Sequence, residues 1–209
     1  MDIHKIYYLF QKKFRPTRMK RFYEIFNIRP DTKVLDVGGG LLNWTFVPYR
    51  PKLTILNILP PSPAEISLDV EWIIGDARCM PFKDKSFDVV FSNSVIEHVG
   101  NYDDQKMCAE EIRRVGKCYF VQTPNFYFPV EPHLITPFVH WLPRKIAKKF
   151  IKLTLSYLIS RDESLPKRYF EEVRLLTPKE MKQLFPDAII EFERWLGIPK
   201  SIYTIKNYC

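Results

Sequence analysis

The stretch Lys33-Val34-Leu35-Asp36-Val37-Gly38-Gly39-Gly40 decides the fold. Its first five residues form an apolar, β-branched run that is typical of a buried strand, and three glycines end that strand. Glycine permits positive φ angles and lets a ligand approach the backbone. The next residues, Leu41–Trp44, predict the start of a helix. A strand, tight turn and helix of this kind can serve a nucleotide, another cofactor or only a tight connection.

Similar apolar runs recur along the chain and alternate with helical segments. We expect further strands at Leu53–Leu59, Trp72–Ile74, Phe87–Phe91, Lys117–Gln122, Ala188–Trp195 and Ser201–Lys206, and helices at Asp104–Arg114 and Thr177–Leu184. The last two strands are joined by a short link and are therefore expected to be antiparallel. The pattern predicts an α/β fold, a Rossmann-like, doubly wound and mostly parallel seven-stranded sheet with a C-terminal antiparallel strand pair.

Length and composition favour one folded domain that spans residues 1–209. Hydrophobic residues make up 46% of the chain and charged residues 27%, which is too apolar for a disordered protein. The four cysteines form no C-x-x-C pair and no close cluster with histidines, so we expect neither a metal site nor a disulfide framework. We find no secretory signal, and no apolar run approaches the roughly 20 residues that cross a bilayer. These features predict a cytoplasmic protein.

Two segments are notably basic, and the formal net charge of the chain is +8. Residues 1–30 predict an amphipathic helical segment that is broken near Pro16. Residues 126–170 predict a helical insertion or lid after the fifth strand, in which Arg144–Ile159 is a basic amphipathic helix. Each segment is either a solvated face over a packed apolar stripe, or a lid or arm that covers the site or contacts an anionic membrane or a nucleic acid.

Four motifs in a fixed order extend the argument beyond the glycine turn. Val34–Gly40 is followed by Gly75–Phe82, then by Ser86–Asn93 and Val95–Val99. In this order the motifs resemble the class I S-adenosylmethionine (SAM)-dependent methyltransferases, most closely the small-molecule branch called methyltransferase type 11. The resemblance covers roughly residues 32–123 and, with the closing strands, most of the chain outside the two basic segments.

The resemblance implies a SAM site at the carboxyl ends of the strands. Asp36 and the glycines Gly38, Gly39 and Gly40 would line the methionine and ribose part of the cofactor. A cationic sulfonium that carries an ammonium group favours carboxylates and carbonyls, which fits these positions. Asn57 ends the second strand, where the family places an acid that grips the ribose hydroxyls. An asparagine can accept from one hydroxyl, at a cost on the order of 1 kcal/mol relative to a carboxylate.

The resemblance also assigns the adenine and methyl ends of the cofactor. Asp76 would accept from the adenine amino group, with Ala77 and Arg78 beside the ring. Asn93, at the end of the fourth strand, would lie near the transferable methyl group. Leu42 stands where the family has its third glycine, which is a second departure from the pattern besides Asn57.

Candidate catalytic residues follow the fifth strand, at the edge where open α/β sheets build their sites. Glu131 and His133 are two residues apart and are held stiffly by neighbouring prolines, so the pair can act as base and orienting partner for an acceptor hydroxyl or amine. The alternative is a rigid loop whose polar groups cap nearby backbone. His98 is either a packing residue or a third chemical group.

Together these features predict SAM-dependent methylation of a small-molecule, sugar or lipid-linked acceptor. No Asn-Pro-Pro-Tyr or Asp-Pro-Pro-Tyr follows the fourth strand, which counts against the amino-methylating enzymes that act on nucleic acids. Two alternatives stay open. The basic arms suggest an RNA methyltransferase, and Leu42 with Asn57 suggests a non-catalytic domain with a degenerate SAM site.

Overall fold

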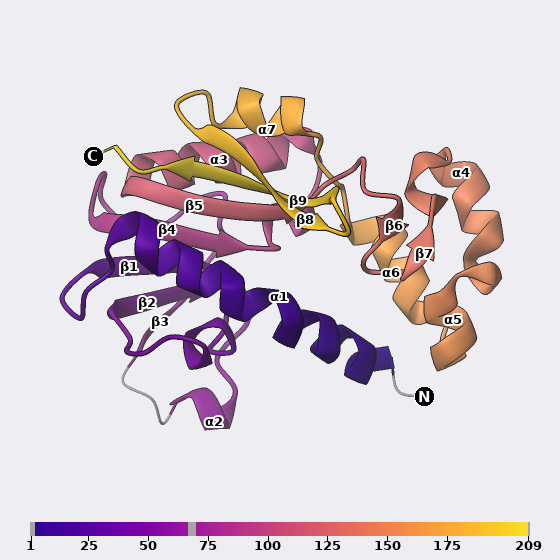
Figure 1. Ribbon diagram of the computed structural model, residues 1–209, viewed down its shortest axis with the longest axis horizontal. Coiled ribbons are helices and arrows are strands. Elements are labelled where there is room, and N and C mark those ends of the chain that lie inside the picture. Colours follow the sequence, from indigo (N-terminus) through magenta and orange to yellow (C-terminus); the bar gives the residue numbers. More distant parts are fainter. Residues whose placement is uncertain (1–2, 67–69, 209) are drawn as a thin grey trace.

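A seven-stranded sheet organises the computed structural model, which describes residues 3–66 and 70–208 (Figure 1). Its order is β3-β2-β1-β4-β5-β9-β8, in which the first five strands are parallel and β9 is antiparallel to both neighbours. The strands are β1 Lys33–Val37, β2 Lys52–Asn57, β3 Glu71–Ile74, β4 Phe87–Asn93, β5 Gly116–Pro124, β8 Ile189–Trp195 and β9 Ile198–Lys206. The predicted fold class is confirmed, including the closing antiparallel pair.

Helices and short 3-10 turns connect the strands. The helices are α1 Ile3–Phe26, α2 Pro63–Ile66, α3 Tyr102–Val115, α4 Arg144–Ala147, α5 Leu155–Ser160, α6 Ser164–Glu172 and α7 Pro178–Leu184. The 3-10 turns are η1 Asn43–Thr45, η2 Ile96–His98, η3 Val139–Trp141 and η4 Lys148–Leu153, and a small separate ribbon pairs β6 Val130–Glu131 with β7 Thr136–Pro137. Among the described residues, no helix combines the length and the apolar character that crossing a bilayer requires.

Helices cover both faces of the sheet. On one face, α1 inserts Met19 and Phe22 against the buried strand residues Val34 and Phe91. On the other face, α3 and α7 pack against the sheet through a cluster that includes Ile112 (Figure 1). The strands between the two layers are apolar on both faces, as expected for buried parallel strands.

Local sequence signals fix where α3 and α7 begin. Asn101 accepts from the backbone N–H of Asp104, whose side chain accepts in return from the backbone of Asn101. Thr177 and Glu180 form the same reciprocal box, with Pro178 at the first helical position. Each box satisfies two backbone donors that a helix start leaves free. The helix predicted at Thr177–Leu184 is therefore confirmed, with Thr177 as its cap.

The predicted break near Pro16 is wrong, because α1 continues through it. A proline inside a helix removes one hydrogen bond and costs about 3 kcal/mol. Tertiary packing outweighs that cost, since Arg15 donates to Asn43 on one side of the proline and Met19 and Phe22 are fully buried on the other.

Two further expectations about helices are wrong. The glycine turn leads only into the 3-10 turn η1, not into an α-helix, and Trp44 from η1 is buried against α1. The single helix predicted for Arg144–Ile159 is divided into α4, η4 and α5. Thr154 causes the second division, because it is extended and its side chain caps α5 by accepting from Tyr157 N.

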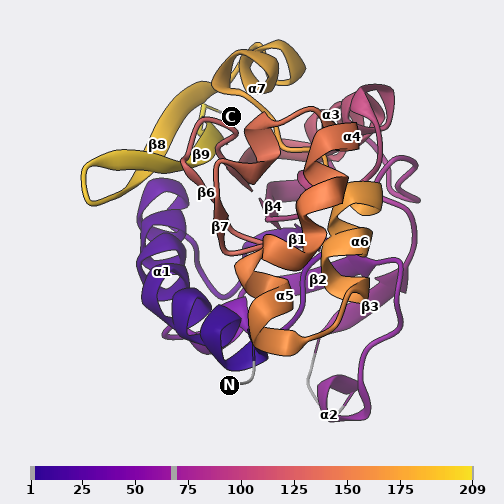
Figure 2. The same cartoon turned by 90° about the vertical axis from the view of Figure 1, so that its right-hand side faces the viewer.

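The insertion between β5 and α7 carries a small apolar core of its own. Leu134 lies fully buried there and packs in one cluster with Val139, Tyr169 and Phe170. The insertion stands at the end of the molecule near the N-terminal part of α1 (Figure 2). It therefore covers the carboxyl end of the sheet, which is where a site of this fold is built.

Cysteine chemistry differs in part from the sequence-based expectation. Cys79 and Cys108 are free thiols, whereas Cys118 on β5 is disulfide-bonded. The cysteine pattern therefore no longer argues for a reducing compartment.

Candidate active site

The glycine turn packs tightly at the end of β1. Gly38 has a φ of +69°, and a Cβ atom there would lie 2.4 Å from Val95. A Cβ atom on Gly39 would lie 2.1 Å from the carboxylate of Asp36. The turn therefore requires glycine at both positions, and it closes over the side chain of Asp36.

Asp36 is a fully buried carboxylate whose two oxygens differ in their hydrogen bonding. Its Oδ2 atom accepts a hydrogen bond of 2.8 Å from Trp44 Nε1. Its Oδ1 atom is buried and has no hydrogen-bond partner among the described residues. Burial raises the pKa of Asp36 to about 7, although the bond from Trp44 and the charge of Arg15 oppose the rise. A cationic donor at Oδ1 would satisfy this atom, so the site fits the ammonium group of a SAM molecule.

Asn57 and Glu65 shape the neighbouring part of the turn. Asn57 donates to the carbonyl of Gly39 at 2.9 Å and accepts from Leu59 N, so both ends of its amide are used within the protein. Glu65 on α2 lies 3.4 Å from Leu41 N, directly beyond the glycines. Sequence analysis missed Glu65, although Ser62 and Glu65 have the spacing of a helix-capping pair.

The residues predicted to bind the adenine end of the cofactor lie in the loop after β3. There, Arg78 is hydrogen-bonded to the carboxylate of Asp76. Arg78 Nη2 lies 2.6 Å from Asp76 Oδ2, and further bonds from the same residue reach both oxygens. Arg78 also bonds to Asp104 at 2.7 Å, and Ala77 is buried beside it. The hydrogen bonds from Arg78 lower the pKa of Asp76. Contact between Asp76 and an adenine amino group requires Arg78 to release one of these bonds.

Asn93, predicted to lie near the transferable methyl group, is held by an arginine from α1. Arg18 is only 5% exposed and its Nη1 donates to Asn93 Oδ1 and, at 2.8 Å, to Gln122 Oε1. Its Nη2 forms an ion pair of 2.7 Å with Glu193 on β8. Burial would raise the pKa of Glu193, but the charges of Arg18 and Lys200 lower it to about 2. Sequence analysis missed Arg18 because it lies in a run of basic residues that resembles a solvated helix face.

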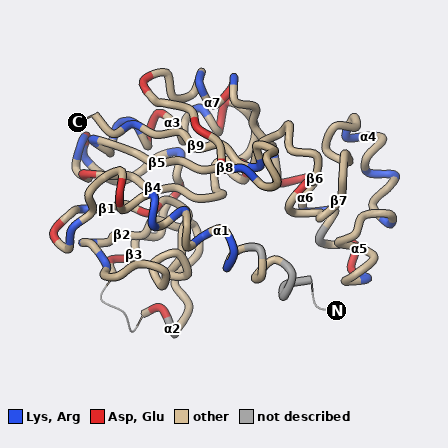
Figure 3. Tube along the Cα trace, viewed as in Figure 1, with Lys and Arg blue, Asp and Glu red and all other residues tan. Residues whose placement is uncertain are grey.

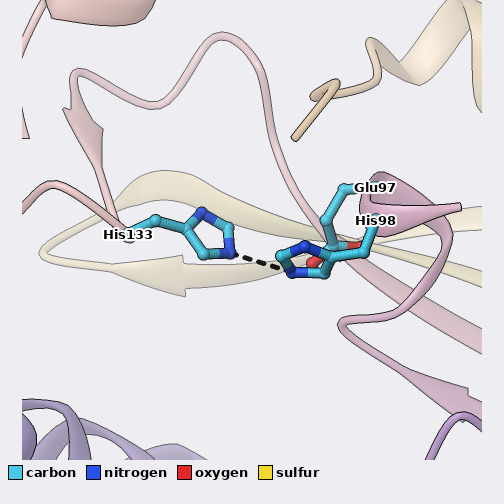
Figure 4. A group of neighbouring side chains, drawn as sticks. All are labelled: Glu97, His98 and His133. Carbon is cyan, nitrogen blue, oxygen red and sulfur yellow. Dashed lines mark hydrogen bonds between the residues drawn. The ribbon is translucent and has the colours of Figure 1, made fainter. Parts of the chain in front are cut away.

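Two of the predicted catalytic residues, His98 and His133, lie side by side (Figure 4), and the third, Glu131, contacts His133. His133 Nδ1 lies 2.7 Å from Glu131 Oε1, and Glu131 is fully buried and accepts from Leu134 N through its other oxygen. His133 Nε2 lies 3.2 Å from His98 Nε2. Burial and the neighbouring imidazole lower the pKa of His98, whereas Glu131 raises the pKa of His133 against the opposing effect of burial.

A cavity of about 1050 Å³ joins these two groups of residues. Its lining includes Arg15, Arg18 and Asn93 together with His98 and His133. Aromatic side chains from α1, the insertion and β8 complete the wall, among them Phe14, Tyr169 and Trp195. The cavity is large enough for a small organic molecule. Arg15, one of its lining residues, also acts through its charge on the carboxylate of Asp36.

Comparison with known proteins agrees with the observed fold. Residues 56–118 match the family described as methyltransferase domain. A SAM-dependent methyltransferase from Archaeoglobus fulgidus superposes with a TM-score of 0.55 at 15% identity, covering 96% of this chain and 99% of that chain. The protein has the fold of the class I methyltransferases.

A second solved structure with this methyltransferase fold is a 1,6-didemethyltoxoflavin-N1-methyltransferase of Burkholderia thailandensis with bound 1,6-didemethyltoxoflavin and S-adenosylhomocysteine. Its TM-score is 0.59 at 10% identity, with 97% of this chain and 81% of that chain covered. An uncharacterized protein of Mycobacterium tuberculosis is 37% identical over 54 residues, which is 26% of this chain and 18% of the length of that protein. The match to this curated relative therefore spans about a fifth of its length.

The packing of Gly38 can be tested by two matched glycine substitutions. Gly38 and Gly197 both have positive φ angles, but a Cβ atom on Gly197 would meet nothing within 4 Å. Gly38→Ala is expected to lower the free energy of unfolding by roughly 1–3 kcal/mol more than Gly197→Ala, because only the first substitution forces side chains apart. Denaturant unfolding of both variants measures the difference, and equal losses would contradict the tight packing against Val95.

The buried carboxylate of Asp36 predicts a pH dependence of stability. The pKa of Asp36 is about 7 in the folded protein, whereas its ordinary value is 3.8. Between these two pH values, the side chain is protonated in the folded state and ionised in the unfolded state. The contribution of Asp36 to the free energy of unfolding therefore falls as pH rises from 3.8 to about 7. Relative to the wild type, the Asp36→Asn variant should gain about 1 kcal/mol or more in free energy of unfolding as the pH rises across this window.

Urea unfolding at several pH values measures this gain. The exposed Glu110 provides the control, since Glu110→Gln also replaces an acid by an amide but changes no buried group. A pH profile of Asp36→Asn that runs parallel to that of Glu110→Gln would contradict the raised pKa.

Proposed function

We propose that the protein is a SAM-dependent methyltransferase whose acceptor is a small or lipid-linked molecule bound in the 1050 Å³ cavity. The Oδ1 atom of Asp36 carries this proposal. It is a buried acceptor without a partner in the described part of the chain, and it lies beneath a glycine turn at the carboxyl end of the sheet. Such an atom suits the ammonium group of the cofactor's methionine part.

Bound SAM would supply an electrophilic methyl group on a sulfonium. Asp36 and the turn Gly38–Gly40 would hold its methionine part, and Glu65 would offer the ribose hydroxyls the carboxylate that Asn57 lacks. Asp76, Ala77 and Arg78 remain the proposed adenine contacts. The proposal for Glu65 follows from its position next to Leu41 N, on the ligand side of the turn.

The remaining residues of the cavity would position the acceptor and keep water away. The hydrogen bond and the ion pair of Arg18 hold α1 across the carboxyl ends of the strands, so the helix forms one wall of the cavity. His98 and His133 line the cavity, and Glu131 orients His133. In methyl transfer, alignment of the acceptor at about 3–3.5 Å from the methyl carbon and exclusion of water provide much of the rate. An imidazole can also take the acceptor proton where the acceptor must lose one.

Calorimetric titration with SAM and S-adenosylhomocysteine tests the cofactor proposal. We expect micromolar binding to the wild type and a loss on the order of 10-fold or more in Asp36→Asn, because a charge-assisted hydrogen bond is removed. Glu110→Gln should bind as the wild type does, and NADH should not bind. No binding of either ligand at millimolar concentration would contradict the proposal and support the degenerate-domain alternative.

Lipid-linked acceptors are favoured by the surface of the insertion. Phe150, Leu153, Leu155 and Leu158 are 42–66% exposed on the insertion, and Leu155 also lines the cavity. Exposed lysines accompany them on α4 and η4 (Figure 3). Apolar side chains beside basic ones suit the interface of an anionic membrane.

Vesicle flotation tests the membrane contact. The wild type should float with vesicles that contain phosphatidylglycerol and less with pure phosphatidylcholine. Leu153→Glu should reduce flotation several-fold, whereas Leu196→Glu should not, although Leu196 is 85% exposed at the tip of the β8–β9 hairpin. Equal flotation of both variants, or none by the wild type, would contradict the contact. RNA methylation stays the alternative, which salt-sensitive binding of mixed RNA would support.

A further inference from the structure

Four side chains form a polar cluster at one end of the cavity. Glu97 and His98 belong to η2, which follows β4, whereas Glu131 belongs to β6 and His133 to the loop after it. One ligand atom each from Glu97, His98 and His133 lie within 4.8 Å of one another (Figure 4). The cluster thus combines two imidazoles and a carboxylate from parts of the chain that the fold brings together.

Glu131 fixes the protonation pattern of His133. Its carboxylate accepts from Leu134 N at 2.6 Å and lies 2.7 Å from His133 Nδ1, so Nδ1 carries the proton in this bond. The lone pair of the neutral imidazole is then on Nε2, which faces His98 Nε2 at 3.2 Å. A carboxylate that orients an imidazole through its other ring nitrogen is the usual support of a metal-bound histidine.

The cluster is also short of positive charge. Glu97 is fully buried, and its Oε2 accepts from Thr123 while its Oε1 has no hydrogen-bond partner in residues 3–66 and 70–208. No lysine or arginine of these described residues forms an ion pair with Glu97 or Glu131. A buried carboxylate with a free oxygen is costly, and a cation between Glu97 and the histidines would offset that cost.

We propose that Glu97, His98 and His133 bind a divalent transition-metal ion, with Zn²⁺ as the fitting probe, and that Glu131 orients His133. Two nitrogens bound about 2.0–2.1 Å from a tetrahedral zinc lie about 3.3 Å apart, close to the separation of the two Nε2 atoms. Two imidazoles and one carboxylate are the ligand set of zinc sites that keep a fourth position open. That position would face the cavity, since His98 and His133 both line it.

The site goes beyond the proposed methyl transfer and does not depend on it. An ion there would occupy the imidazole lone pairs, so the histidines would no longer serve as proton acceptors. It would instead lower the pKa of an acceptor hydroxyl bound at its open position. No metal site was expected from the sequence, because its cysteines form no C-x-x-C pair and no close cluster with histidines. His98 and His133 are 35 residues apart in the chain, and only the fold brings them together.

Metal binding can be measured directly on the purified full chain without a histidine tag. After chelation and dialysis, calorimetric titration with Zn²⁺ should give one ion per chain, and Co²⁺ should produce the absorption of a site with nitrogen and oxygen ligands. The variant Cys79→Ser provides the background, because Cys79 is an exposed free thiol. Mg²⁺ should bind much more weakly, since imidazole ligands favour the later transition metals.

Substitutions assign the ligands. His98→Ala and His133→Ala should each weaken Zn²⁺ binding at least 10-fold, and Glu131→Gln should weaken it on the order of 10-fold through the orientation of His133. Glu97→Gln nearly preserves side-chain shape and tests the carboxylate even where an alanine variant unfolds. His140→Ala is the matched control, since His140 bonds to the Phe126 carbonyl and lies outside the cluster.

Absence of Zn²⁺ binding by the Cys79→Ser protein, or full binding by a His98→Ala/His133→Ala double variant with an unchanged thermal melt, would overturn the site. Titration of the same preparations with SAM keeps the two proposals separate. A protein that binds SAM but not Zn²⁺ refutes only the metal site, and a protein that binds Zn²⁺ but not SAM refutes only the methyltransferase proposal.

Discussion

The buried guanidinium of Arg18 connects the parts of the molecule on which the cavity depends. One side chain from α1 bonds to Asn93 at the end of β4, to Gln122 on β5 and to Glu193 on β8. Removing one partner of a buried ion pair leaves an uncompensated charge that typically costs 3–5 kcal/mol. The position of α1, and with it one wall of the cavity, is therefore fixed at the carboxyl edge of the sheet.

Several of the buried polar side chains lie at one edge of the sheet. Most of the sheet is apolar on both faces, but its carboxyl edge holds Asp36, Asn93, Glu97 and Gln122. Two of the carboxylates keep one oxygen without a hydrogen-bond partner in the described part of the chain. Stability alone disfavours such atoms, because they lose water without gaining a replacement. Their presence at one edge marks the region that a cofactor, an acceptor or an ion would complete.

The sequence was sufficient to predict the strands of the sheet, but not to predict how the residues of the site come together. The pattern of apolar residues and the turn residues predicted every strand of the sheet, because buried parallel strands are continuous apolar runs. The helix starts carry capping boxes, which mark where α3 and α7 begin. The motif order also led to Asp36 and to the glycine turn. Pro16 was misjudged because tertiary packing outweighs the local cost of a proline. Helix formation after Gly40 was misjudged because the chain needs only a 3-10 turn to bury Trp44.

Other features of the site were beyond local reasoning. Arg18 resembles its solvated neighbours in sequence, and only the fold shows that it is buried. The pairing of Glu131 with His133 follows from their spacing, whereas their meeting with Glu97 and His98 depends on how the insertion returns over the sheet. Long-range packing of this kind leaves no periodic signal in the chain.

A crystal structure of the protein with S-adenosylhomocysteine would test the central claim most directly, namely that cofactor and acceptor sites meet at Asn93 under α1. The account predicts that the amino group of the ligand bonds to Asp36 Oδ1 and that its sulfur faces the cavity between Asn93 and His98. A ligand bound away from the Gly38–Gly40 turn, or one whose sulfur is separated from the cavity by Arg18, would contradict it.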